Sequence, residues 1–175
     1  MKLITLGHGT LSKEDFAALI KHAGIQRLID VRTVPKSRHN PQFFSDKMKE
    51  WVPTLSGAAY EWDKDLGGFR HAKPDSKNIY WKNAAFRGYA DYMQTDQFAQ
   101  AFAQLVDKIK KEQCAIMCSE TLWWRCHRRM IADAVVLLAH IEVQDLWHDG
   151  KLTEHVVTPG ARVVGGKVLY DVIKS

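Results

Sequence analysis

The sequence has few cysteines and no long hydrophobic run. Its 175 residues include three cysteines. This odd number argues against a disulfide framework, as does the spacing of Cys114 and Cys118, four residues apart in one expected strand. A membrane-spanning helix needs roughly 18 consecutive apolar residues, and no stretch approaches that length. Because residues 1–8 also turn polar too early for a secretory signal, we expect a cytoplasmic protein with reduced thiols and no membrane partner.

Several signatures of bound groups are also missing. The histidines and cysteines show no paired Cys-x-x-Cys arrangement, so we expect no metal. Neither a glycine-rich nucleotide fingerprint nor a Gly-x-Ser-x-Gly elbow occurs, and we expect no cofactor. Residues 119–124 contain no glycine, whereas cysteine phosphatases and rhodaneses wrap an oxyanion with backbone amides and favour glycine for that close approach. This loop therefore argues against their mechanism.

The composition fits one compact domain over residues 1–175. Hydrophobic residues make up 46% of the chain and charged residues 26%, which suffices to enclose a core. The 25 Lys+Arg exceed the 20 Asp+Glu and give a formal charge of +5. This excess allows an anionic partner without requiring one, because nucleic-acid binders usually concentrate their positive charge in a patch.

The hydrophobic pattern predicts an α/β fold. Residues 2–31 read as strand, helix and strand, with a capping box at residues 12–15 and a stop at Gly24. Such a unit has a right-handed crossover and belongs to a parallel sheet. We expect a Rossmann-like, three-layer domain with a mainly parallel sheet flanked by helices, a long irregular loop at 63–82 and a short C-terminal β hairpin within 150–175. The other expected strands are 58–62, 113–117 and 142–147, and the other expected helices are 45–55, 84–93, 96–111 and 125–139.

Polar residues follow three of the expected strands. His8 follows the first strand, Arg32 follows the second, and Cys118 and Glu120 follow strand 113–117. In open α/β sheets the ligand crevice lies beyond the carboxyl ends of the strands. We therefore expect these four side chains to share one cleft.

Cys118 is the expected nucleophile or redox thiol. It precedes a helix whose amino end carries a partial positive charge, and Arg125 and Arg128 lie nearby, so its pKa would fall toward the reactive thiolate. His8, Glu120 or His127 would move protons. The alternative is a small buried side chain at the edge of the core.

The remaining candidates would bind substrate. Arg32, Arg38, Arg125 and Arg128 would hold an anion, and Asn40 and Arg87 lie on segments that could reach the same cleft. Trp124 offers a wall for stacking a base or another flat group. Each has a plainer alternative, such as a solvated loop for residues 32–41 and a core position for a tryptophan.

Three functional hypotheses follow. The first is a cysteine-dependent hydrolase or transferase acting on an anionic small molecule, phosphate-bearing or nucleotide-like, in the cleft at the strand ends. The second is a nucleic-acid-binding or regulatory module that uses the same arginines and tryptophans. The third is a protein-interaction domain without catalysis.

The motifs together resemble the mostly bacterial domain-of-unknown-function family 488. The resemblance implies a Rossmann-like α/β fold and no established activity, and Gly9 departs from the Gly-His-Ser more usual in that family. A weaker similarity, in Asp30-Val31-Arg32 and Cys118, is to rhodanese-like domains. The motifs that carry the family resemblance are Gly7-His8, Asp30-Val31-Arg32, Pro35, Ser37-Arg38, Asn40-Pro41, Leu66-Gly67-Gly68, Phe86-Arg87-Gly88-Tyr89, Met117-Cys118-Ser119-Glu120 and Trp124-Arg125-Cys126-His127-Arg128.

Overall fold

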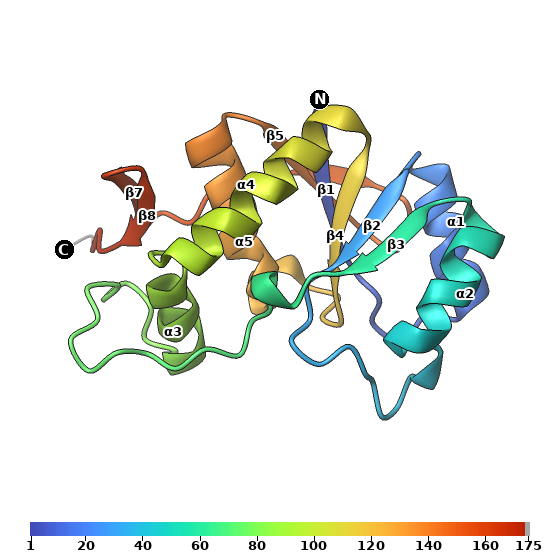
Figure 1. Cartoon of the computed structure of the whole chain (residues 1–175), viewed down its shortest axis with the longest axis horizontal. Coiled ribbons are helices and arrows are strands. Elements are labelled where there is room, and N and C mark those ends of the chain that lie inside the picture. Colours follow the sequence, from blue (N-terminus) through green and yellow to red (C-terminus); the bar gives the residue numbers. More distant parts are fainter. Residues whose placement is uncertain (174–175) are drawn as a thin grey trace.

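A six-stranded, mainly parallel sheet forms the centre of the molecule (Figure 1). A computed structural model describes residues 1–173. The strand order is β3-β2-β4-β1-β5-β6, and all neighbours are parallel except β6, which is antiparallel to β5. The expected α/β class is therefore confirmed. The strands are β1 (Lys2–Gly7), β2 (Arg27–Asp30), β3 (Ala59–Trp62), β4 (Cys114–Cys118), β5 (Glu142–Leu146) and β6 (Leu152–Glu154).

Helices cover both faces of this sheet. Alternate residues of a strand point to opposite faces, so Leu3 joins the apolar cluster under α3, α4 and α5, while Ile4 joins the cluster under α1 and α2. Figure 1 shows these two groups of helices on opposite sides of the strands. The expected three-layer arrangement is confirmed. The helices are α1 (Lys13–His22), α2 (Ser45–Ser56), α3 (Ala84–Tyr92), α4 (Asp96–Lys111) and α5 (Arg128–Ala139). Within residues 1–173, none of the helices has the length and apolar character needed to cross a membrane.

Local signals explain most of the boundaries. The Ser12 hydroxyl accepts a hydrogen bond from the Asp15 amide and caps α1, as expected. The C-terminal hairpin is also confirmed, with β7 (Ala161–Val164) and β8 (Lys167–Tyr170) joined at Gly165 and Gly166, which both have positive φ. Residues 174–175 of the expected 150–175 segment lie outside the described part of the chain.

The start of α5 corrects the sequence-based boundary. We expected a helix from residue 125, but Trp123–Arg125 forms a separate 3-10 turn, Cys126 is extended with φ −130° and ψ 149°, and α5 begins at Arg128. The break leaves Cys126 just before the helix instead of inside it, so that its side chain lies at the amino end of α5.

The irregular segment 63–82 is organised around one buried carboxylate. Asp91 of α3 accepts hydrogen bonds from the Lys73 amide at 2.8 Å, the Ser76 hydroxyl at 2.6 Å and the Asn78 side chain at 2.7 Å. These bonds hold the outer part of the segment on α3, and its first residues, up to Phe69, reach the carboxyl edge of the sheet.

Candidate functional site

A cavity of about 410 Å³ opens at the carboxyl ends of β2 and β4. The cavity forms there because the loops after these two strands diverge, which is the usual ligand position in such sheets. Five residues expected from the sequence line it: Arg32, Cys118, Glu120, Arg125 and His127. Cys126, Lys36, Phe69 and Phe86 contribute further parts of the lining.

The floor of the cavity holds two thiols. Cys118, at the end of β4, is 3% exposed, and its sulfur accepts a hydrogen bond from Nη1 of Arg128 at 2.7 Å. The sulfur of Cys126 accepts a hydrogen bond from the backbone amide of Arg128 at 3.4 Å. Because this amide is the first of α5, Cys126 faces the positive end of the helix dipole.

Arg128 is buried without a carboxylate beside it. The side chain is 1% exposed and donates to the backbone carbonyls of Glu120 and Thr121 and to the Thr5 hydroxyl. Within residues 1–173 it makes no ion pair with an aspartate or glutamate. An unpaired buried charge is costly, and the groups nearest to Arg128 that can become anions are the two thiols.

The two thiols differ in acidity. Burial raises the pKa of Cys118 well above its ordinary value, and its hydrogen bond to Cys126 adds to the rise. Burial also opposes ionisation of Cys126, but the hydrogen bond from Cys118, the charge of Arg128 and the N–H groups of Arg128 outweigh it and lower the pKa of Cys126 to about 7. Cys126 is therefore the more acidic thiol of the pair.

His127 presents an unprotonated nitrogen to Cys126. Its Nε2 lies 2.9 Å from the carbonyl of Val31 and 3.1 Å from that of Leu66. Carbonyls only accept hydrogen bonds, so Nε2 carries the proton. Nδ1, 3.5 Å from the Cys126 sulfur, is then an acceptor. Burial lowers the pKa of His127, which favours the neutral ring and leaves Nδ1 free to take a proton.

Arg32, on the lining of the cavity, forms a buried cluster with His8. The Arg32 guanidinium binds Asp30 through two bonds of 2.9 Å and 2.7 Å and also donates to the carbonyl of Phe43. His8 lies next to Arg32, with Nε2 at 3.4 Å from Nη1, and stacks on Phe43. Burial, followed by the charge of Arg32, lowers the pKa of His8 to about 4. His8 is thus neutral near pH 7 and contacts Arg32 instead of lining the cavity.

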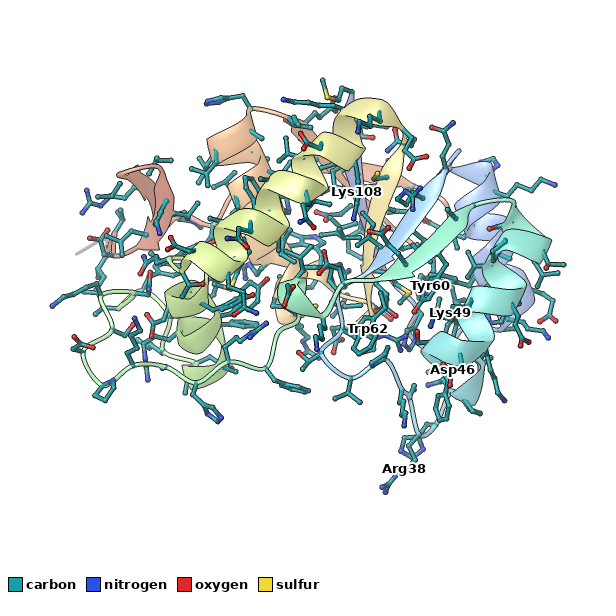
Figure 2. The ribbon with its side chains drawn as sticks, in the orientation of Figure 1. Arg38, Asp46, Lys49, Tyr60, Trp62 and Lys108 are labelled. Atoms are coloured by element: carbon teal, nitrogen blue, oxygen red, sulfur yellow. The ribbon has the colours of Figure 1, made fainter. Side chains whose placement is uncertain are left out.

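Besides His8 and Arg128, which are buried next to the lining, four residues expected in the site lie outside the cavity. Figure 2 shows Arg38 at the tip of its loop, pointing away from the rest of the molecule, and Asn40 hydrogen-bonds to Ser37 in the same loop. Arg87 donates to the carbonyl of Trp81 and lines a different hollow. Trp124 packs against Trp123 and Trp147.

Three further features of the site were not anticipated. Cys126 carries the more acidic thiol, and its position directly before His127 and Arg128 at a helix start is the signal that could have indicated it. Phe69 and Lys36 line the cavity, but nothing in their local sequence marks them. Two glycines permit close packing: a Cβ on Gly7 would lie 1.7 Å from the Glu120 carbonyl oxygen, and one on Gly68 would lie 2.5 Å from Nδ1 of His127.

Comparisons with known proteins identify a family. The family model described as "Domain of unknown function DUF488" matches residues 12–135, a range that includes both thiols, His127 and Arg128. No curated protein and no solved structure matches the chain. The similarity to rhodanese-like domains is not confirmed by these comparisons. The match covers well over half of the sequence, so the chain belongs to the DUF488 family.

Proposed function

We propose that this protein is a thiol-dependent hydrolase or transferase that acts on an anionic substrate, phosphate-bearing or nucleotide-like, in the cavity above Cys118 and Cys126. The observation that carries the proposal is the buried guanidinium of Arg128, which contacts the sulfur of Cys118 and neutral acceptors but no carboxylate, while the backbone amide of Arg128 donates to the sulfur of Cys126. Such a cation favours a thiolate beside it. The pKa of Cys126, about 7, gives a large thiolate fraction at neutral pH.

The roles follow from the contacts. The Cys126 thiol gives its proton to Nδ1 of His127, and the thiolate attacks the electrophilic atom of the substrate. A bond forms from sulfur to that atom as its bond to the leaving oxygen breaks, and the imidazolium returns the proton to the leaving oxygen. Water or an acceptor alcohol then attacks the same atom and releases the thiolate, with Glu120 taking the proton of the attacking group.

The other residues would support this step. Cys118 donates its thiol proton toward the Cys126 thiolate. Arg125 and Lys36, on the cavity lining, would hold the anionic group of the substrate. His8 keeps Arg32 in place from behind the cavity, which makes it a positioning residue.

Burial supports an enzyme over a nucleic-acid-binding module. A module of that kind needs arginines on an open surface, where they reach successive phosphates. Arg32 and Arg128 are nearly inaccessible, and Arg38 and Arg125, which are exposed, belong to different loops. The buried arginines can act on a small group inside the cavity, but not on a polymer passing outside it.

Alkylation with iodoacetamide between pH 5.5 and 9.5, followed by peptide mass spectrometry, tests the proposal. Cys126 should react with a midpoint near pH 7, while Cys114, whose pKa burial raises to about 11, serves as an unreactive internal reference. Incubation with a panel of phosphate monoesters and acyl phosphates, quenched in acid, should give a covalent adduct on the wild type and none on Cys126→Ser. If Cys126 reacts as slowly as Cys114 at pH 7.5, the proposed thiolate does not exist.

A further inference from the structure

The cavity has a polar floor and an apolar mouth. The thiols lie at the floor, with Arg128 behind Cys118, whereas Val34, Phe69 and Phe86 line the mouth. Phe69 is 77% exposed and Val34 is 54% exposed. A single exposed apolar residue needs no explanation, but here two of them and the partly buried Phe86 line one cavity, with the cations of Lys36 and Arg125 in the same lining.

The backbone around Phe69 is fixed on both sides. Before it, Gly67 and Gly68 pack so closely that a Cβ would meet Thr33 at 2.6 Å and His127 at 2.5 Å. The amide of Phe69 itself donates to the Thr33 hydroxyl at 3.0 Å. After it, the Arg70 guanidinium bonds to the carbonyl of Gly67 and lies 3.6 Å from the centre of the Tyr92 ring. The backbone that carries Phe69 is therefore held at the mouth while its side chain stays 77% exposed, and a ligand that covers the ring loses little entropy in ordering the loop.

We propose that Phe69 stacks on a planar aromatic group of the substrate, which makes a nucleoside monophosphate, or a molecule of the same build, the substrate class of this cavity. This inference rests on the proposed function, because the phosphate would be held by Arg125 and Lys36 above the thiols. Arg125 and Lys36 would bind the phosphate of this substrate, and the ring of Phe69 would bind its planar aromatic group. Every nucleobase has a π face, so the stacking would select for a base without selecting among bases.

Two phosphate-bearing ligands, one with a base and one without, test the stacking separately from the binding of the phosphate. Adenosine monophosphate carries a base, and ribose 5-phosphate carries the same sugar and phosphate without one. By isothermal titration calorimetry, the wild type should bind adenosine monophosphate about 5- to 100-fold more tightly, the range expected for stacking one base on an aromatic side chain. Phe69→Ala should lose this difference while binding ribose 5-phosphate as the wild type does, and Phe69→Tyr should keep it. Val163→Ala, an exposed apolar residue on the C-terminal hairpin, is the matched control and should change neither affinity.

The outcomes distinguish the inference from the function on which it rests. If both phosphates slow the alkylation of Cys126 but bind equally well, or if Phe69→Ala preserves the preference for adenosine monophosphate, the stacking role is overturned and the thiol site stands. If neither phosphate binds or protects Cys126, the anion site itself is refuted, and the inference falls with it.

Discussion

The two buried arginines at the carboxyl edge of the sheet differ in how their charge is matched. Arg32 is 6% exposed and makes a two-bond ion pair with Asp30, which also accepts a hydrogen bond from Tyr60 at 2.6 Å. Arg128 is 1% exposed and has only carbonyl oxygens, a hydroxyl and sulfur around its guanidinium. Asp30 neutralises the charge of Arg32. The charge of Arg128 is free to stabilise a thiolate that forms beside it or the anionic group of a bound ligand.

A carboxylate approaches Arg128 only through an intervening residue. The Thr5 hydroxyl, which accepts from Nε of Arg128, donates to Asp145. Asp145 in turn bonds to His155 at 3.2 Å, and His155 bonds to Asp133 at 2.9 Å. Asp145 thus acts on Arg128 only at a distance, through its charge, and is hydrogen-bonded to His155 and Thr5 instead. A buried cation in a direct ion pair indicates a structural role. A buried cation with no carboxylate in contact can instead stabilise an anion that forms on a neighbouring group.

Breaking the matched pair should have the largest effect. Asp30→Asn leaves Arg32 buried with no counter-charge, so the free energy of unfolding should fall by about 3–5 kcal/mol. Urea denaturation followed by tryptophan fluorescence measures this loss. The double variant Asp30→Asn with Arg32→Met removes both charges and should recover much of the stability. A loss below about 1 kcal/mol for Asp30→Asn would mean that Arg32 is not neutralised as the geometry indicates.

Two buried histidines, His155 and His8, should make the free energy of unfolding depend on pH in opposite directions. Hydrogen bonds and charges of Asp133 and Asp145 outweigh burial and raise the pKa of His155 to about 9. Its contribution is therefore complete below the unfolded pKa of about 6.5 and is lost as the pH rises through 9. One pKa unit corresponds to about 1.4 kcal/mol, so this loss is about 3 kcal/mol.

His8 has the reverse sign. Its pKa is lowered to about 4, so the folded state disfavours protonation, and stability falls as the pH drops from about 6.5 toward 4. Urea titrations across pH 4–9.5 should therefore show the alkaline slope vanish in His155→Gln and the acidic slope diminish in His8→Gln. His71→Gln, an exposed histidine, is the control and should leave both slopes in place. Identical slopes in all three variants would contradict this assignment.

Removing the charge of Arg128 should have a smaller energetic effect, which falls on the acidity of Cys126. In Arg128→Met the Cys126 thiolate loses the nearby positive charge, and its pKa should rise by about 1–2 units. The rate of iodoacetamide alkylation at pH 7 should then fall about tenfold or more. Arg129→Met, the neighbouring arginine, whose guanidinium lies over the rings of Trp81 and Trp123, is the matched control and should react at the wild-type rate. An unchanged midpoint in Arg128→Met would show that Arg128 does not set the acidity of the thiol.

The fold and the convergence of the strand ends could be predicted because both follow from local patterns. Short apolar runs and the capping box at Ser12 locate the strand-helix-strand unit, and a parallel sheet brings residues such as Arg32 and Cys118 to one edge. The acidity of Cys126 was missed, because the expected helix began at residue 125 and enclosed Cys126, whereas α5 begins at Arg128.

The places of the loops were also beyond prediction. Arg38 and Asn40 lie away from the cavity because Phe43, which ends their loop, is completely buried against Phe16 and Trp51, and its carbonyl binds Arg32. The loop is thereby drawn to the face covered by α1 and α2. These contacts join segments far apart in the chain, and no periodicity within the loop reports them.

The site also depends on Gly7, a residue with no reactive group. The space that a methyl group would fill at this position is occupied by the carbonyl oxygen of Glu120, the same oxygen that accepts a hydrogen bond from Arg128. Alanine at position 7 would displace that oxygen, and the guanidinium would lose an acceptor that holds it against the sulfurs. The acidity of the thiol thus depends on the absence of a side chain at one position of the adjacent strand, and variation at Gly7 would act on chemistry through shape alone.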